Sequence, residues 1–220
     1  MTPAAKNSLR TAFVLIAFTI VGTGLLAYTF DITKTNIAKN EEQAERDLIN
    51  QALPKSLYDN DIVHDVVRLP PTPELGTTHP SAAYRARLHG APSALVLEAI
   101  APDGYSGQIV LLVAIQSNGE LAGVRVVSQH ETPGLGDYID SAKSDWIKQF
   151  DHASLARYDA QAWKVKKDGG RFDYMTGATI SPRAVVKAVH KALRYYAQHG
   201  SAIFAQPMLS NGHGDSLSAK

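Results

Sequence analysis

The chain has 220 residues, of which 45% are hydrophobic and 20% are charged, and glycine and proline together occupy 27 positions. This composition is typical of a globular protein and excludes a wholly disordered or collagen-like chain. Basic residues number 22 against 21 acidic ones. The chain therefore lacks the basic excess that nucleic-acid binding needs. Because it has no cysteine, disulfides, thiolate metal sites and a lipidated cysteine anchor are also excluded.

Residues 11–30 contain no charged side chain and no histidine. As a helix they would extend about 30 Å, the thickness of the hydrocarbon core of a bilayer. The pattern predicts a transmembrane helix after a short cytoplasmic N-terminus at residues 1–10. A cleaved signal peptide or a buried core helix is the alternative, but the stretch is longer than a signal core and offers no small-residue cleavage site. Basic residues on the two sides are nearly balanced, so they favour a cytoplasmic N-terminus only weakly.

Residues 31–54 are predicted to form a helical stalk that continues out of the membrane. Ile37, Ala44, Leu48 and Ala52 recur at helical spacing between charged residues, and Pro54 ends the run. The rest of the chain is predicted to be one domain at residues 55–199, followed by a flexible tail at residues 200–220.

The domain is predicted to be α+β, with a twisted antiparallel sheet and packed helices. Five short runs read as strands: 94–100, 108–115, 121–127, 163–165 and 171–174. Asn118-Gly119 predicts a type I′ hairpin turn between the second and third. A helix is predicted through Tyr138, Trp146 and Phe150, and another from Pro182 to about Gln198, with Ser181 as its N-cap.

The segment Asp173-Tyr174-Met175-Thr176-Gly177-Ala178-Thr179-Ile180-Ser181-Pro182 joins a predicted strand to a predicted helix. A helix N-terminus offers free N–H groups and a partial positive charge, so this segment is a candidate phosphate site. A Thr/Ser-rich turn before proline is also a common way to begin a helix without any ligand.

A second candidate segment is His130-Glu131-Thr132-Pro133-Gly134-Leu135-Gly136. A His-Glu pair could act as acid and base or bind a metal ion. No second histidine follows at ligand spacing, so no metal site is predicted, and a shaped loop that contacts a ligand through its backbone is favoured. The chain contains no motif of dinucleotide-binding folds, P-loop NTPases, serine hydrolases or zincins.

Together, in this order and behind an N-terminal span, the two segments resemble the FMN-binding domain family. Within that family the chain resembles the G subunit of the Rnf (Rsx) ion-translocating electron-transport complexes and, less closely, the C subunit of sodium-pumping NADH:quinone reductases. Asp173-x-x-Thr176-Gly177-Ala178-Thr179 matches the flavinylation pattern D-x-x-[S/T]-G-A-T, and residues 130–136 match an H-x-T-P-G-L-G-type loop. The resemblance covers residues 11–199.

This resemblance implies that FMN is the cofactor and that a flavin transferase attaches it to Thr179 as a phosphoester. It implies a recognition role for Asp173, and no catalytic side chain or metal ligand. The other residues expected to bind the cofactor lie in the two segments: Thr176, Gly177, Ala178, Ser181, Glu131, Thr132, Leu135 and Gly136.

The resemblance further implies a redox subunit of a translocase, in which FMN relays electrons within a membrane complex coupled to ion translocation. The partners would be subunits A, B, C, D and E of an Rnf-type complex in the cell inner membrane, with the flavin domain on the periplasmic side. Two alternatives stay open: a stand-alone extracytoplasmic flavoprotein without ion pumping, and a non-redox accessory domain.

Overall fold

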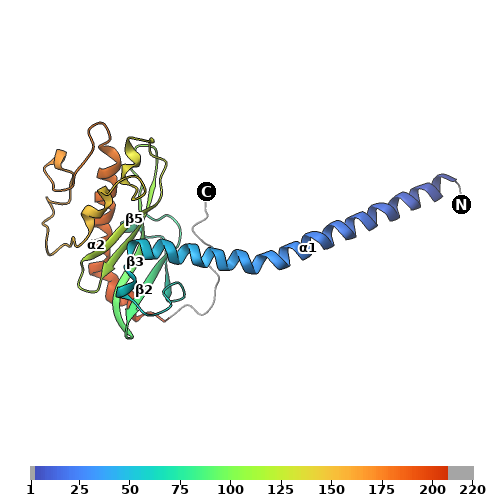
Figure 1. The fold of residues 1–220 in the computed structure, drawn as a ribbon, viewed down its shortest axis with the longest axis horizontal. Helices are drawn as coiled ribbons and strands as arrows, with labels where there is room; N and C mark the ends of the chain where they lie inside the picture. The colour runs from blue at the N-terminus through green and yellow to red at the C-terminus, as the bar shows by residue number, and fades with distance from the viewer. Residues whose placement is uncertain (1–2, 208–220) are drawn as a thin grey trace. The chain divides into compact units, whose positions relative to one another are not determined.

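The computed structural model describes residues 3–207, without the side chains of residues 4–6, 8–9, 35–36 and 38. The chain divides into two compact units, Met1–Glu45 and Arg46–Lys220. Helix α1 (Pro3–Ala52) forms the first unit and continues into the second (Figure 1). Both predicted N-terminal helices are therefore parts of one helix without a break.

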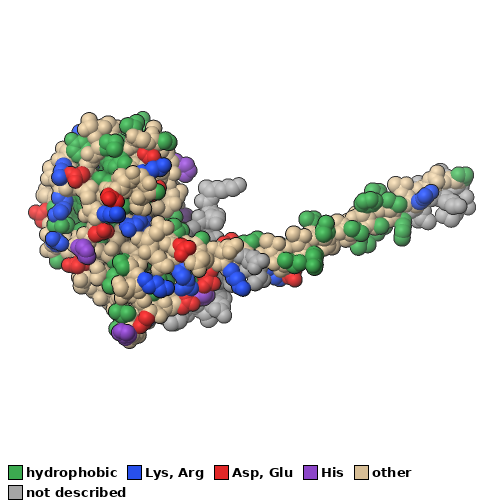
Figure 2. All heavy atoms as spheres, in the orientation of Figure 1, with side chains coloured by type: hydrophobic (Ala, Val, Ile, Leu, Met, Phe, Trp, Pro, Cys, Tyr) green, Lys and Arg blue, Asp and Glu red, His purple; other side chains and the backbone are tan. Residues whose placement is uncertain are grey.

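The apolar residues of the first unit are exposed, as Figure 2 shows along α1. Phe13, Phe18 and Leu26 each expose more than 70% of their surface. In water such a surface would be unfavourable, but in a bilayer it contacts lipid. By length and composition the helix is able to cross a membrane.

The second unit is built on an antiparallel sheet with the strand order β1-β2-β3-β4-β5. The prediction of an antiparallel α+β domain is confirmed, as are the three predicted strands between residues 94 and 127. The strands are β1 (Val66–Leu69), β2 (Ser81–Leu88), β3 (Ala91–Ala101), β4 (Ile109–Gln116) and β5 (Leu121–Ser128). Sequence reasoning missed β1, which is short and followed by two prolines, and β2, which is rich in alanine and arginine rather than in β-branched residues.

The β4–β5 hairpin is confirmed, but the predicted type I′ turn is wrong. Gly119 has φ +84°, whereas Asn118 does not have a positive φ. The Gly119 amide donates to the Gln116 carbonyl at 2.8 Å. The Gln116 amide also donates to the Glu120 carbonyl at 2.8 Å, so three residues connect this last hydrogen-bonded pair. A three-residue connection in which a left-handed glycine follows a tight turn is the next most common way to join two antiparallel strands.

The two faces of the sheet bury separate cores. One face packs against helix α2 (Ile180–Ala205), and its largest cluster includes Leu95, Leu97, Leu111 and Val113. The opposite face packs against the end of α1 and the segment that follows it. The buried residues of this second core are Ile49, Ala52, Leu53, Tyr58, Ile62, Tyr84, Ala86, Ala94, Val96, Leu112 and Ala114. Alternation of side chains along β3 and β4 supplies both cores at once.

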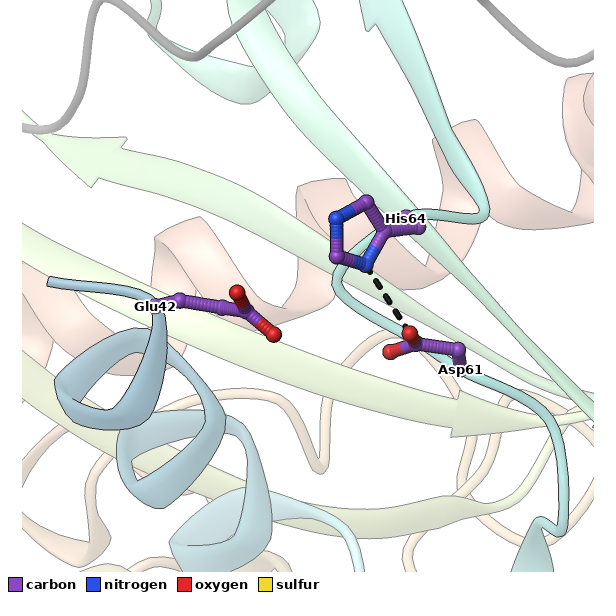
Figure 3. A group of neighbouring side chains, drawn as sticks. All are labelled: Glu42, Asp61 and His64. Atoms are coloured by element: carbon purple, nitrogen blue, oxygen red, sulfur yellow. Dashed lines mark hydrogen bonds and ion pairs between the residues drawn. The ribbon is translucent and has the colours of Figure 1, made fainter. Parts of the chain in front are cut away.

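An ion pair ties the end of α1 to the segment that follows it, because Arg46 Nη2 lies 2.8 Å from Asp61 Oδ1. Within that segment, His64 Nδ1 lies 2.9 Å from Asp61 Oδ2 (Figure 3). Partial burial would raise the pKa of Asp61, but the hydrogen bonds and charges of Arg46 and His64 hold it below its usual value.

The region between residues 136 and 172 differs from the prediction. The expected helix through Tyr138 and Phe150 is two short 3₁₀ helices, η3 (Gly136–Ile139) and η4 (Trp146–Phe150). The two expected strands at residues 163–165 and 171–174 reduce to a single bridge between Val165 and Phe172. Tertiary packing of aromatic rings decides this region, because the Phe150 and Phe172 rings stack at 4.6 Å and the Trp146 and Phe150 rings meet edge to face at 5.6 Å.

Helix α2 is longer than predicted at both ends. It begins at Ile180 with Thr179 as its N-cap, so the prediction of Ser181 as the N-cap is wrong. It continues to Ala205 through residues expected in the flexible tail, because Ile203 is buried in the core. Residues 208–220 of that expected tail lie outside the described residues.

Candidate functional site

Both candidate segments meet at the N-terminus of α2, and a buried carboxylate joins them. Ser181 Oγ, in the second residue of α2, donates a 2.7 Å hydrogen bond to Glu131 Oε2. Glu131 exposes only 4% of its surface and Ser181 only 1%. Segments 50 residues apart in the sequence are thus fixed to each other by a single contact between two predicted site residues.

Gly136 belongs to the same contact. A Cβ at this position would lie 2.8 Å from both Glu131 Oε2 and Ser181 Oγ, closer than a Cβ approaches other heavy atoms. A larger residue at position 136 would therefore displace the Glu131–Ser181 pair, and it is this packing, and not a positive φ, that favours glycine. The contact that Gly136 makes in the structure is with the Glu131–Ser181 pair, and its expected contact with the cofactor stays a prediction.

The loop from Thr132 to Asp137 is closed by its own backbone. The Thr132 carbonyl accepts from the amides of Leu135 and Gly136, each at 3.0 Å, and Asp137 Oδ1 accepts from the Gly134 amide at 2.8 Å. The Thr132 and Leu135 side chains are exposed. The loop thus presents both side chains outward from a fixed backbone. His130 is exposed as well, whereas Glu131 is buried and engaged with Ser181, so the two do not form an acid–base pair.

The Thr176-Gly177 pair forms the centre of a tight turn. The Ala178 amide donates to the Met175 carbonyl at 3.0 Å, and Gly177 has φ +91°. A positive φ at the third residue but not at the second is the pattern of a type II turn, which explains a glycine at this position. Tyr138 fixes both ends of the turn, because its hydroxyl accepts from the Met175 amide at 3.0 Å and donates to the Ala178 carbonyl at 3.3 Å. Burial raises the pKa of Tyr138, and the Met175 hydrogen bond partly opposes that rise.

Asp173 is anchored through its backbone and presents its side chain to solvent. Trp146 Nε1 donates to the Asp173 carbonyl at 2.7 Å, and the Asp173 amide donates to Gln149 Oε1 at 2.8 Å. Its carboxylate forms an ion pair with Lys166, and both side chains are about half exposed. The carboxylate is thus available at the surface beside the turn.

Comparison with known proteins identifies these segments. Residues 104–194 match the FMN-binding domain family, and residues 1–52 match the RnfG N-terminal region. The chain is 47% identical over 208 residues to the G subunit of the ion-translocating oxidoreductase complex of Pseudomonas aeruginosa, covering 94% of this chain and 97% of that protein. It is 44% identical over 203 residues to the corresponding protein of Vibrio atlanticus, covering 92% and 97%, and 42% identical over 213 residues to that of Shewanella baltica, covering 97% and 99%.

This chain belongs to the family of G subunits of ion-translocating oxidoreductase complexes. Its FMN-binding domain contains both candidate segments, and its matched N-terminal region ends at Ala52, the last residue of α1. FMN is accordingly the cofactor of this family member.

The residues at the N-terminus of α2 fit a flavin phosphate. Because the first N–H groups of a helix have no intrahelical acceptor, those of Ile180 and Ser181 are free to bind an anion. Thr179 precedes them as the N-cap, and its side chain makes no capping hydrogen bond. Thr179 and Ala178 are largely buried, whereas Thr176 and Gly177 are exposed. The two threonines of the motif therefore have different environments.

Cationic side chains follow on the outer side of α2. One turn after Thr179, Arg183 holds Asp168 with a two-pronged ion pair, Nε to Oδ2 at 2.5 Å and Nη2 to Oδ1 at 2.7 Å. This hydrogen bonding lowers the pKa of Asp168 and raises that of Arg183. Lys187, a further turn along, pairs with Asp103 at 2.6 Å. The first turns of α2 are therefore held by both neighbouring loops.

Sequence reasoning missed the residues that position the turn. Tyr138 and Trp146 were interpreted only as apolar positions of a helix, and Gln149 and Lys166 carried no signal at all. A third loop at residues 103–107 was missed as well, although Gly104-Tyr105-Ser106-Gly107 combines a turn composition with an isolated aromatic residue. Its contacts with Glu131 appear only in the folded chain.

Proposed function

We propose that this protein is a membrane-anchored flavoprotein subunit that carries FMN as a phosphoester on Thr179 and relays electrons within an ion-translocating oxidoreductase complex. The observation that carries this proposal is the Glu131–Ser181 hydrogen bond. It brings the flavinylation segment and the loop at residues 130–136 together at one helix N-terminus, inside the FMN-binding domain. When bound, the isoalloxazine supplies the redox chemistry, and the protein supplies position and electrostatics.

Thr179 suits the attachment because of its place on α2. A phosphate esterified at the N-cap would face the partial positive charge of the helix N-terminus, which stabilises an anion by about 0.3–1 kcal/mol at an exposed site. The remaining residues that we propose to contact the cofactor surround this position: Thr176, Gly177, Ala178, Ser181, Glu131, Thr132, Leu135 and Gly136. The exposed loop at residues 132–135 offers both backbone and side chains to a ligand on the surface.

The attachment is tested by a matched pair of variants. Thr179→Val, expressed with a flavin transferase, should show no covalent flavin by intact mass and no fluorescent band on a denaturing gel. Thr176→Val is the control, because it removes the other hydroxyl of the motif and should retain the added mass of FMN. Covalent FMN on Thr179→Val, or its loss only from Thr176→Val, would contradict the assignment.

We further propose that Asp173 is read by the flavin transferase. Its backbone is fixed by hydrogen bonds with Trp146 and Gln149. Its carboxylate is about half exposed, with Lys166 as its partner, so it is accessible to another protein. Asp173→Ala should therefore fold normally and acquire little covalent flavin in the same assay, whereas a purely structural role predicts lower stability with normal flavin content.

The proposed partners are subunits A, B, C, D and E of an Rnf-type complex, and the proposed location is the inner membrane with the second unit on the periplasmic side. The names of the relatives support membership of such a complex. Affinity purification of the tagged full chain from membranes should recover integral-membrane subunits together with covalent flavin. A flavin-loaded chain that purifies alone would instead favour a stand-alone electron carrier.

A further inference from the structure

A third loop, outside both motifs, is bound to the same carboxylate that joins them. The Ser106 amide donates a 3.2 Å hydrogen bond to Glu131 Oε1, while Ser181 holds the other oxygen. Gly104 is as tightly packed as Gly136, because a Cβ there would lie 2.7 Å from Glu131 Oε1. Glu131 therefore fixes three segments at one point: the loop at 104–106, the loop at 131–136 and the start of α2.

Each of these three segments exposes one large apolar side chain directly beside its contact with Glu131. Tyr105 lies between Gly104 and Ser106, Leu135 precedes Gly136, and Ile180 precedes Ser181. Their exposed fractions are 68%, 46% and 44%.

This exposure is confined to the site. Among the described residues of the second unit, the exposed large apolar side chains are all on these segments or on the adjoining turn: Tyr105, Leu135, Tyr174, Met175 and Ile180. An exposed apolar group in a domain whose other large apolar residues are buried or partly buried marks a binding surface. Ile180 directly follows Thr179, so a cofactor attached there begins at the edge of this surface.

We propose that Tyr105, Leu135 and Ile180 form an apolar platform for the isoalloxazine ring of FMN, with the Tyr105 ring stacked on it. The inference rests on the proposed attachment at Thr179. The ring is planar, aromatic and largely apolar, which fits an exposed phenol between two aliphatic side chains. The FMN-binding domain match begins at Gly104, the neighbour of Tyr105. Glu131 is the positioning residue of the platform, since it holds the backbone beside all three side chains.

Fluorescence of the attached flavin tests the role of Tyr105. A phenol or indole in contact with an excited flavin quenches its fluorescence by donating an electron that then returns, and phenylalanine does not. In the detergent-purified full chain with covalent flavin, Tyr105→Phe and Tyr105→Ala should lengthen the flavin fluorescence lifetime severalfold, and Tyr105→Trp should keep it short. Tyr105→Ala should also weaken the visible circular dichroism of the flavin, whereas Tyr105→Phe should preserve it.

Tyr28→Ala is the control, because Tyr28 is an exposed tyrosine of the first unit, outside the segments that meet at Glu131. It should leave both signals unchanged. Normal covalent flavin with unchanged lifetime and dichroism in Tyr105→Ala would overturn the platform, as would an equal change in Tyr28→Ala. Unchanged flavin signals with lost co-purification of other subunits would overturn it in favour of a protein-docking surface. A wild-type chain without covalent flavin would instead contradict the proposed function, so the two failures are distinguishable.

Discussion

At the residue scale, the site depends on a carboxylate that is buried and fully engaged. Glu131 accepts from the Ser181 hydroxyl and from the Ser106 amide, and two glycines leave room for it. A buried acceptor that loses its donor keeps the cost of its desolvation, so each of these contacts should be measurable.

Ser181→Ala removes the hydroxyl that donates to Glu131 Oε2. Because the oxygen stays buried, we expect a loss of about 1–3 kcal/mol in the free energy of unfolding. Denaturant unfolding of the detergent-solubilised full chain measures it, with Ser117→Ala, an exposed serine of the β4–β5 turn, as the control. Equal stabilities of the two variants would show that the Glu131–Ser181 bond contributes nothing.

Gly177→Ala tests the type II turn separately from packing. Gly177 has φ +91° and open space where a Cβ would stand, so the variant meets only backbone strain of about 1 kcal/mol. Gly119→Ala is a close match, with φ +84° and the same open space, but it lies in a remote hairpin. Both should lose similar stability in thermal unfolding, while only Gly177→Ala should lower covalent flavin per protein. Equal flavin content in the two would argue against a requirement for the turn.

At the element scale, α2 is fixed at its two ends by different chemistry. Its N-terminus meets Glu131, and its C-terminal carbonyls meet Arg85, which is fully buried on β2. Arg85 Nη1 donates to the Ile203 carbonyl at 3.2 Å, and its Nη2 lies 2.6 Å from Asp65 Oδ1. The guanidinium thus balances the negative end of the helix and a buried carboxylate together.

Arg85→Met should destabilise the domain without touching the site. Removing one partner of a buried ion pair costs about 3–5 kcal/mol when the other charge is left without a partner. Because Arg87 still pairs with Asp65 at 2.8 Å, we expect a smaller loss of about 1–3 kcal/mol, which comes from the helix carbonyls that lose their donor. Thermal unfolding measures this loss, with Lys143→Met as an exposed control. Covalent flavin per folded protein should stay at the wild-type level, since Arg85 contacts the opposite end of α2 from Thr179. A variant as stable as Lys143→Met would contradict this account of the helix end.

Glu98 on β3 gives the fold a dependence on pH. Burial raises the pKa of this carboxyl, and the charge of His79 opposes the rise only in part. Since the folded state favours the protonated form, stability should fall as pH rises from the unfolded glutamate pKa, about 4.3, through the raised folded pKa. Glu98→Gln should lose this fall and gain stability relative to wild type at neutral pH. The free energy of unfolding of each protein is measured from pH 4 to 8. A constant difference between Glu98→Gln and wild type over this range, as expected for the exposed Glu74→Gln, would contradict the prediction.

At the scale of the whole molecule, one helix connects a membrane-compatible segment to the sheet. The first unit exposes its apolar surface, whereas the last turns of α1 bury one face among core residues of the second unit, with Ile49 fully covered. The same element therefore has a surface suited to lipid over one part and packs on a protein core over another, and its composition changes accordingly.

The absence of cysteine allows a direct test of topology. Ser117→Cys, exposed in the β4–β5 turn, should react with a membrane-impermeant maleimide in spheroplasts. Asn7→Cys, before the span, should react only after lysis, because the proposed N-terminus is cytoplasmic. The reverse pattern of labelling would place the flavin domain in the cytoplasm.

Sequence patterns were sufficient to predict features that depend on neighbouring residues alone. The uncharged run at residues 11–30 predicts a span because charge in hydrocarbon is costly. Short runs rich in valine, leucine and isoleucine predict β3, β4 and β5. The paired motifs identify the family and Thr179 as the candidate attachment residue. In each case the signal lies within a few neighbouring residues.

The tertiary structure decided what depends on distant partners. The aromatic residues between 138 and 172 adopt 3₁₀ turns and not a helix and two strands, because their rings pack on one another. The Ser181 side chain is hydrogen-bonded to Glu131, and the N-cap of α2 is Thr179. At the other end, α2 continues to Ala205 because Arg85 and the core hold its last turn. The sequence around Tyr105 indicates a turn with an isolated aromatic residue, but nothing in it points to Glu131. The loop that contains Tyr105 lies beside the two motifs because the buried Glu131 carboxylate accepts a hydrogen bond from the Ser106 amide, a contact that no local pattern encodes.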